Sequence, residues 1–421
     1  MDSPTSDSEY TDFRRTTPPE SEASVEHDDT IPPDHEYRTL VLCFDGTGDQ
    51  FDEDNSNIVN FFSMLKKDDP KKQLVYYQVG LLPKSNHQQV PFAYKMYSRD
   101  DPTGWKQSTA FKKAFSIDVD IELLGVWETV GSVGMIPKRL PFTTSNTHVR
   151  YFRHALALDE HRVRFKPNFW NRPTPEELHL TADTDHTPNP NSTRRTRLKA
   201  KETTRDWERR HDGGEYETDI EEVWFAGSHC DVGGGAVRNE VRNSLARIPL
   251  RWMVRQCFIL KTGILFHREL FKVIGMDPDS LYPEVRARPP AVTKTKEYSP
   301  EVKYLQPRSG NGKGHTLVDT SDFVSEEEED LADALSPVND MLKILPAWWI
   351  LEWIPQKVKY QGDDDEWVNQ LLINRGRGRR IPRQEIDGVR IHRSVKLRMD
   401  NKKLHYKPKA QWNLDATVWV G

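Results

Sequence analysis

The chain has 421 residues, of which 36% are hydrophobic and 30% charged, and its formal net charge is −5. This length allows one large domain or two ordinary ones, but so polar a composition leaves part of the chain outside any packed core. The net charge excludes a global basic field, so we expect no nucleic-acid partner.

The three cysteines, Cys43, Cys230 and Cys257, are odd in number and widely spaced. That pattern fits a reducing compartment better than a disulfide framework. The N-terminus lacks the apolar run of a signal peptide. The most apolar stretch, "ILPAWWILEWI" at 344–354, is too short to span a bilayer and contains Glu352. We therefore expect a soluble cytoplasmic protein without a transmembrane segment.

Three segments have a polar composition without periodicity. Residues 1–36 hold 11 acidic residues against two arginines and predict a disordered acidic tail. Residues near 171–218 and 286–340, the second containing "SEEEED", predict long surface excursions. The remainder, within 37–421, is expected to form one domain.

Between these segments the pattern is that of an α/β protein. "TLVLCF" (39–44) is a short continuous apolar run, typical of a strand that is buried on both faces. "QLVYYQV" (73–79), "IELLGVW" (121–127) and "IEEVWFA" (220–226) predict three more strands. One face of a helix lies between the first two strands, which predicts a parallel pair joined by a right-handed crossover; its residues are Ile58, Phe61, Phe62 and Leu65.

Polar residues follow three of these strands directly. They are Asp45, Gly46 and Thr47 after the first strand, Glu128 after the third, and the stretch "GSHCDVGGG", which contains His229 and Asp231, after the fourth. Ligands of open parallel sheets bind at the carboxyl ends of the strands. The sequence therefore predicts that these three clusters meet at one functional edge.

A His, an acidic residue and a glycine-rich bend at strand ends suit a hydrolase of the Ser–His–acid kind. In such a site the acid fixes the imidazole tautomer, and the imidazole takes the proton of the nucleophile. The chain order in α/β-hydrolases is nucleophile, acid, His, and Glu128 followed by His229 matches the last two members.

Five motifs, in order, resemble one family: "LVLCFDGTGDQFDEDNSNIVNFF", "GVWETVGSVG", "ALALDEHRVRFKP", "WFAGSHCDVGGG" and "VRIHRSVKLRM". They are similar to the α/β-hydrolase-like catalytic domain of type VI secretion phospholipase effectors, a family with many uncharacterised fungal homologues. The resemblance covers about residues 37–421 apart from the polar excursions. It implies an α/β-hydrolase-like parallel sheet flanked by helices, a lipid or ester substrate and no cofactor. It places the catalytic base on His229, the acid on Glu128 in place of Asp, and the "DGT" motif on Asp45, Gly46 and Thr47.

The resemblance also implies a nucleophile elbow between the second strand and the acid strand, and this chain has none. "YYQVG" (76–80) runs directly into "LLPKSNHQQVPFAYKMYSRDD", without a Gly-x-Ser-x-Gly motif or a buried strand. A strand, elbow and helix would need on the order of 25 residues. We therefore interpret the chain as a catalytically inactive or truncated member of the family.

Two other functions fit the residues. Asp45, His229 and Asp231 could be hard-cation ligands of a metal-dependent phosphoesterase, which needs no serine. Alternatively, the acidic tail and the "SEEEED" segment could bind partners of a non-catalytic interaction module. Blander roles also exist: Asp45 could form an Asx-type turn, the "LPAWWILEWIP" stripe could be core rather than a lipid contact, and "RGRGRR" (375–380) could be a solvated surface.

Losing a central strand also has a consequence for the sheet. Each buried unpaired backbone group costs about 1–3 kcal/mol, so we expect the strands at 73–79 and 121–127 to close the gap. Closure would displace Glu128 relative to His229 by roughly 4.8 Å. We predict that all four strands form one parallel sheet with His229 at its carboxyl edge. We also predict no Ser or Cys on an elbow within hydrogen-bonding reach of His229; Ser132 on a sharp turn would contradict this.

Overall fold

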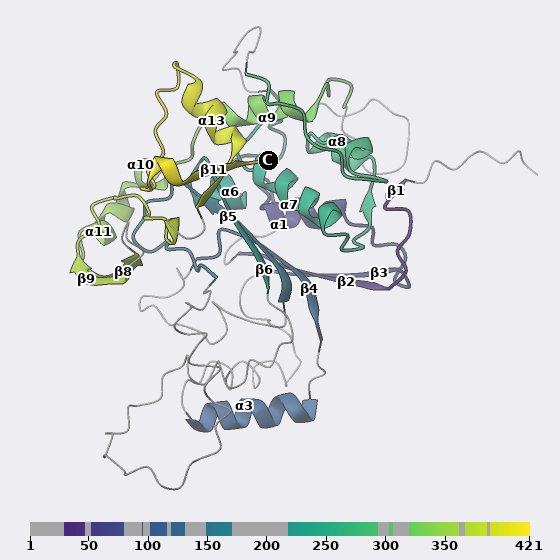
Figure 1. Cartoon of the computed structure of the whole chain (residues 1–421), viewed down its shortest axis with the longest axis horizontal. Helices are drawn as coiled ribbons and strands as arrows, with labels where there is room; N and C mark the ends of the chain where they lie inside the picture. Colours follow the sequence, from purple (N-terminus) through teal and green to yellow (C-terminus); the bar gives the residue numbers. More distant parts are fainter. Residues whose placement is uncertain are drawn as a thin grey trace, which may run out of the picture.

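The computed structural model describes a three-dimensional arrangement for most of the chain (Figure 1). The described residues are 29–46, 52–79, 95, 102–115, 119–130, 149–170, 218–293, 303–305, 320–361, 367–384 and 388–421. The predicted excursion at 171–217, Thr47, Ser132 and most of the predicted acidic tail therefore lie outside the described residues. None of the described helices is both long and apolar enough to cross a membrane.

The centre of the fold is a five-stranded parallel sheet with strand order β11-β10-β6-β5-β4. Its strands are β4 (Ile121–Trp127), β5 (Val149–Ala157), β6 (Asp219–Phe225), β10 (Val389–His392) and β11 (Thr417–Val420). Helices flank this sheet, so the α/β class predicted from the sequence is confirmed. The strand β5, which is rich in buried small and branched residues, was missing from the sequence prediction.

The helices are α1 (Asn57–Met64), α3 (Pro102–Phe115), α6 (His229–Gly233), α7 (Arg247–Ile259), α8 (Leu270–Val273), α9 (Glu326–Ala334), α10 (Met341–Ile344), α11 (Trp349–Glu352) and α13 (Arg393–Asp400). Short 3-10 turns occur at η2 (Pro278–Ser280), η3 (Pro346–Trp348) and η4 (Leu414–Ala416). Helix α1 begins where predicted, because the hydroxyl of Ser56 accepts a hydrogen bond from the N–H of Val59.

Three small sheets accompany the large one. Strand β1 (Thr30–Ile31) pairs antiparallel with β7 (Phe266–His267), and β8 (Gln356–Gln361) pairs antiparallel with β9 (Trp367–Leu372). Strand β2 (Thr39–Phe44) pairs in parallel with β3 (Gln73–Gln78). Since β1 is buried against β7, ordered structure begins before the boundary expected at residue 36.

The prediction that the sheet closes over the missing strand is wrong for the residues described. The β2–β3 pair is parallel as expected, but within the described part of the chain no hydrogen bonds join it to β4. Both nevertheless contribute to one core: Phe61 of α1 contacts Trp127 at the end of β4, and Val41 and Cys43 of β2 are buried in the same cluster. Helices α1 and α7 form one layer that packs against both the β2–β3 pair and the end of β4. The two sheets thus lie side by side, without hydrogen bonds between them in the described residues (Figure 1).

The two pieces differ in how their faces are covered. In β5 and β6 successive residues are buried on opposite faces, in two different hydrophobic clusters. In β2 only alternate residues are buried, and Leu40, Leu42 and Phe44 are 61%, 50% and 56% exposed. The second face of the β2–β3 pair is therefore apolar and largely uncovered.

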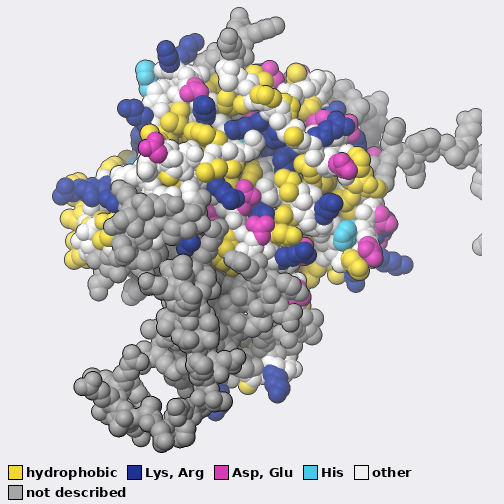
Figure 2. Space-filling view, in the orientation of Figure 1, with side chains coloured by type: hydrophobic (Ala, Val, Ile, Leu, Met, Phe, Trp, Pro, Cys, Tyr) yellow, Lys and Arg dark blue, Asp and Glu magenta, His cyan; other side chains and the backbone are white. Residues whose placement is uncertain are grey.

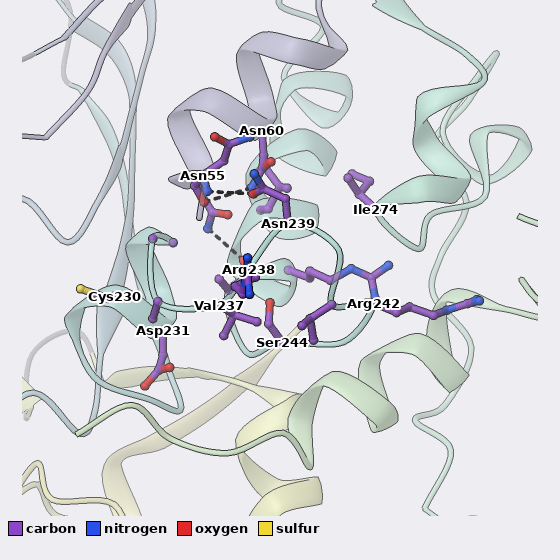
Figure 3. Close-up of a pocket in the computed structure, with 18 of the residues that line it drawn as sticks. Asn55, Asn60, Cys230, Asp231, Val237, Arg238, Asn239, Arg242, Ser244 and Ile274 are labelled. Atoms are coloured by element: carbon purple, nitrogen blue, oxygen red, sulfur yellow. Dashed lines mark hydrogen bonds between the residues drawn. The ribbon is translucent and has the colours of Figure 1, made fainter. Parts of the chain in front are cut away.

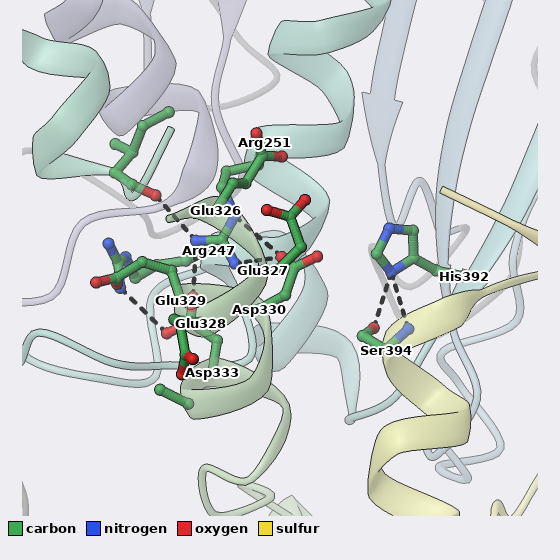
Figure 4. Close-up of polar contacts among 12 residues, drawn as sticks. Arg247, Arg251, Glu326, Glu327, Glu328, Glu329, Asp330, Asp333, His392 and Ser394 are labelled. Carbon is green, nitrogen blue, oxygen red and sulfur yellow. Dashed lines mark hydrogen bonds and ion pairs between the residues drawn. The ribbon is translucent and has the colours of Figure 1, made fainter. Parts of the chain in front are cut away.

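The "SEEEED" segment is not a surface excursion. It forms the start of α9, whose acidic residues are mostly buried against a group of arginines from α7 and other segments (Figure 4). Arg251, only 1% exposed, pairs with Asp330 at 2.7 Å and with Asp333 at 2.7 Å. Because each buried carboxylate has an arginine partner, the acidic run serves helix packing, and it is not free to bind a partner as predicted.

Candidate functional site

The carboxyl edge of the large sheet brings three polar segments together. Glu128 follows β4, the charged run Asp159–Arg162 follows β5, and His229 follows β6 as the first residue of α6. The three strands are neighbours in register, with Trp127 opposite Ala155 and Ala157 opposite Phe225. The predicted convergence is therefore correct for Glu128 and His229.

Glu128 and His229 form a direct acid–imidazole pair. The Nδ1 atom of His229 lies 3.1 Å from Oε2 of Glu128, whose side chain is fully buried. Because a carboxylate only accepts hydrogen bonds, Nδ1 is the nitrogen that carries the proton when the imidazole is neutral, and the lone pair is then on Nε2. The closure from which a displacement of Glu128 was predicted does not occur among the described residues, where β4 pairs with β5 and β5 with β6.

The carboxylate of Glu128 has two further partners. The backbone N–H of Ala157 donates to Oε1 at 2.5 Å. Arg379 donates through Nη1 to Oε1 at 2.7 Å and through Nη2 to Oε2 at 2.8 Å. Arg379 is itself buried and also donates to the carbonyls of Ala157 and Phe165. The acid is thus fixed by a two-point clamp, and its backbone adopts a left-handed conformation with φ +47°.

The electrostatics of Glu128 follow from this clamp. Burial alone would raise the pKa of the carboxyl, but the charge of Arg379 and the hydrogen bonds from His229 and Arg379 hold that pKa well below its usual range. Glu128 is therefore ionised across the physiological pH range. A permanent carboxylate at Nδ1 is what an imidazole needs to accept a proton at Nε2, because the carboxylate stabilises the resulting imidazolium.

The imidazole of His229 is partly exposed, with 26% of its side chain accessible. The ring of Phe165 packs edge-on at 5.0 Å between centroids, and the His229 backbone N–H lies 3.3 Å from Oε2 of Glu160. Among the described residues, the hydrogen-bonding partner of the His229 ring is Glu128, and no hydroxyl or thiol bonds to Nε2. Ser132, the residue that would contradict the missing-nucleophile prediction, lies outside the described residues.

Asp231 lies in the same motif but turns away from His229. Its carboxylate, 2% exposed, accepts hydrogen bonds from the backbone N–H groups of Ser228 at 2.8 Å and Asn339 at 3.0 Å, and from the Asn339 amide at 2.7 Å. Burial raises its pKa. Asp231 therefore fixes the first turn of α6, and with it the position of His229.

Asp45 is also buried and committed to structure. Its carboxylate accepts from Tyr77 at 2.6 Å, from Ser56 at 2.8 Å and from the N–H of Gly46 at 2.9 Å. These bonds tie the end of β2 to β3 and to the first turn of α1. The Asx-type turn weighed for Asp45 agrees with its bond to Gly46.

The metal-centre alternative does not fit this geometry. Asp45 and Asp231 bind different protein groups, and His229 binds Glu128. Within the described ranges no group of three or more His, Cys, Asp or Glu side chains could hold a metal ion. Asp45, His229 and Asp231 thus do not form one ligand set.

The glycine turn after α6 contacts the segment that precedes α1. Gly234, at φ +87°, forms an isolated bridge with Ser56, and a Cβ there would lie 2.5 Å from the N atom of Asn57. Only glycine permits this approach. A cavity of about 140 Å³ adjoins the turn, with polar side chains such as Asn55, Asn60 and Asn239 on its wall (Figure 3).

Sequence reasoning missed two contributors to the site. Arg379 belongs to "RGRGRR", which by its composition resembles a solvated basic run. Glu160 and Arg162 belong to "LDEHR", where Arg162 forms a 2.7 Å bond to Glu160 and stacks 3.4 Å above the Phe165 ring. The run Asp159–Arg162, three charged residues and a histidine directly after an apolar strand, was the signal that could have revealed Glu160 and Arg162.

Comparisons with known proteins bear on this arrangement. A family model described as the T6SS phospholipase effector Tle1-like catalytic domain matches residues 38–81 and 78–256. An uncharacterized protein of Saccharomyces cerevisiae, YEL023C, is 24% identical over 438 residues, covering 79% of this chain and 63% of its own length. The chain thus spans less than two thirds of that relative. The crystal structure of an uncharacterized protein from Pseudomonas aeruginosa aligns at 14% identity with a TM-score of 0.31, over 60% of this chain and 49% of that one.

Proposed function

The chain belongs to the family of type VI secretion phospholipase effector Tle1-like catalytic domains, and on that premise we propose that it is a lipid- or ester-hydrolase homologue that keeps its acid and base but lacks its nucleophile. The observation that carries the proposal is the Glu128–His229 pair at the end of two neighbouring strands. The pair has the tautomer and the ionised acid of a working triad, and no hydroxyl to serve among the described residues.

The chemistry follows from the two side chains. In an acyl transfer, Nε2 of His229 would take the proton of an attacking hydroxyl, while Glu128 stabilises the imidazolium. Without a hydroxyl on an elbow, no covalent acyl-enzyme can form. The chain in its present form therefore acts either as a non-catalytic homologue that binds ester lipids, or as a shortened form of an active hydrolase.

Three observations support a missing segment near Gly80. The family match is divided into two parts that meet at residues 78–81. The alignment with the yeast protein runs over 438 residues although it covers 79% of a 421-residue chain, so it includes stretches of that relative with no counterpart in this chain, as a missing segment anywhere within it would require. Among the described residues, the apolar side chains on one face of β2 are exposed and one edge of β4 has no strand paired to it; both features support the proposal of a missing central strand, because such a strand would be covered on both faces.

Ester turnover tests the proposal in two forms of the chain. The first is the chain as it stands, and the second carries at Gly80 a strand–elbow–helix segment with a Gly-x-Ser-x-Gly motif, taken from the genomic interval or, failing that, from a family member. We expect turnover of short acyl esters and phospholipids only in the second form, and its loss in His229→Ala. Turnover by the unaltered chain that disappears in His229→Ala would contradict the proposal.

A further inference from the structure

The lobe formed by α10, η3, α11 and the β8–β9 hairpin carries its large apolar side chains on the outside. Ile350, Trp353 and Leu371 are 69%, 56% and 67% exposed. We call the whole set the apolar patch, and its members are Ile344, Leu345, Trp349, Ile350, Trp353, Ile354 and Leu371. The stripe that could have been core is therefore on the surface.

The polar groups of the same segment point inward, which reverses the usual distribution for a surface helix. Glu352, 1% exposed, accepts hydrogen bonds from the backbone N–H of Val163 at 2.6 Å and from the Asn374 amide at 2.6 Å. Asp340, at the start of α10, binds His161 at 2.8 Å and Lys409 at 2.5 Å. The buried acids Glu352 and Asp340 thus anchor the lobe to the rest of the protein. Because these acids face inward, the apolar patch faces outward in the folded lobe.

The exposed charges that the structure describes beside the apolar patch have one sign; the acidic residues 363–366 lie outside the described ranges. Among the described charged side chains of residues 341–380, the exposed ones are all basic: Lys343, Arg375, Arg377 and Arg380. The Arg375 guanidinium lies 5.3 Å above the ring of Trp353. Figure 2 shows the two kinds of side chain next to one another at the left edge of the molecule, where Figure 1 places α11, β8 and β9.

The lobe that carries the apolar patch reaches the candidate site through Trp348. Trp348, between α10 and α11, packs against Phe165 at 5.6 Å between ring centroids, and Phe165 packs against His229 at 5.0 Å. Two aromatic rings therefore connect the exposed lobe to the imidazole.

We propose that the apolar patch docks the protein on the surface of a lipid bilayer that contains anionic headgroups. Exposed tryptophans and aliphatic side chains insert at the boundary between headgroups and acyl chains, and arginine and lysine beside them attract anionic lipids. A second copy of the chain fits less well, because a two-fold interface through the patch would bring the basic side chains of both copies together. The proposal deepens the proposed function by naming the surface that meets the lipid, and its test does not depend on catalysis.

Vesicle flotation tests the proposal with ether-linked phospholipids, which an ester hydrolase cannot cleave, so failure of the catalytic proposal would leave this result unaffected. Two vesicle types are used, one of phosphatidylcholine alone and one with added phosphatidylserine. We expect the full chain to bind the anionic vesicles and Ile350→Glu or Trp353→Glu to lower the partition coefficient about tenfold. Arg375→Glu with Arg377→Glu should weaken binding to the anionic vesicles about tenfold, and hardly change binding to the neutral ones.

Leu414→Glu is the matched control, because Leu414 is 66% exposed outside the lobe and should bind like the unaltered chain. Equal binding by Ile350→Glu and the unaltered chain, or no binding of the unaltered chain to either vesicle, would overturn the proposal. So would sedimentation that finds a dimer which Ile350→Glu dissociates, since the patch would then be a protein interface.

Discussion

The β5–β6 centre and the β2–β3 pair are built from similar apolar strands, yet only the first is covered on both faces. Val223, Trp224 and Phe225 of β6 are at most 3% exposed, whereas Leu40, Leu42 and Phe44 of β2 are at least half exposed. One face of each region packs against α7. The difference therefore comes from the neighbours of the strands and not from the strands themselves.

If the chain lacks its nucleophile strand as proposed, this difference explains how the acid–base pair can keep its geometry. Glu128 and His229 are positioned by β4, β5, β6 and Arg379, which all belong to the large sheet or pack against it. The break falls between β2 and β4, on the other side of Glu128. The proposed loss of a strand between them would expose apolar surface on β2 without moving the pair.

The largest effect is expected at Arg379, which belongs to the covered side. Arg379→Met would leave the Glu128 carboxylate buried without its main counter-charge, and breaking such a pair costs about 3–5 kcal/mol. Urea denaturation measures this free energy of unfolding. Arg377→Met, two residues away at an exposed position, should change it by no more than about 0.5 kcal/mol. Equal effects of the two substitutions would contradict the claim that Arg379 stabilises the buried Glu128 carboxylate.

A matched pair of leucines compares the two regions directly. Leu156→Ala in β5, where the side chain is fully buried, should cost about 2–5 kcal/mol. Leu42→Ala in β2, where half of the side chain is exposed, should cost about 0.5 kcal/mol or less. The same denaturation experiment measures both, and a restored segment at Gly80 should increase the cost at Leu42. A large cost at Leu42 in the unaltered chain would mean that its face is covered.

A smaller effect concerns pH and His392, at the carboxyl end of β10. Burial, against the opposing charge of Asp330, lowers the pKa of His392 to about 3. Because the unfolded state takes up this proton near pH 6.5 and the folded state does not, the contribution to stability is complete above pH 6.5 and decreases as the pH falls toward 3. Between pH 6.5 and 5 the loss is about 1.5 kcal/mol.

His392→Asn should remove this loss, and it keeps a side chain that can accept the N–H of Ser394 and cap α13. The measurement is the free energy of unfolding of both proteins at pH 6.5 and pH 5. Parallel decreases in the two proteins would show that His392 titrates in the same way in both states.

The sequence predicted the local features of this fold well. Strand positions follow from continuous apolar runs, and the meeting of Glu128 and His229 follows from parallel strands ending at one edge. Their pairing is determined by a few residues on either side of each strand end, so it could be read without tertiary information.

The features that depend on distant partners were not predicted. "SEEEED" and "RGRGRR" have the composition of a solvated surface. Their burial depends on distant partners: the acids of α9 pair with arginines such as Arg251 of α7, and Arg379 pairs with Glu128. The outward direction of Ile350 and Trp353 depends on Glu352 finding Val163 and Asn374. The separation of β2–β3 from β4 among the described residues was not predicted either, because helices can hold two sheets together without hydrogen bonds between them.

Labelling by a fluorophosphonate probe tests the central claim most directly, namely that His229 has no serine to activate. The probe reacts with a serine hydroxyl only when a base has activated it, and mass spectrometry of the digested chain locates any adduct. We expect no adduct on the unaltered chain under conditions that label an active serine hydrolase. An adduct on Ser132 or another serine, abolished by His229→Ala, would contradict it.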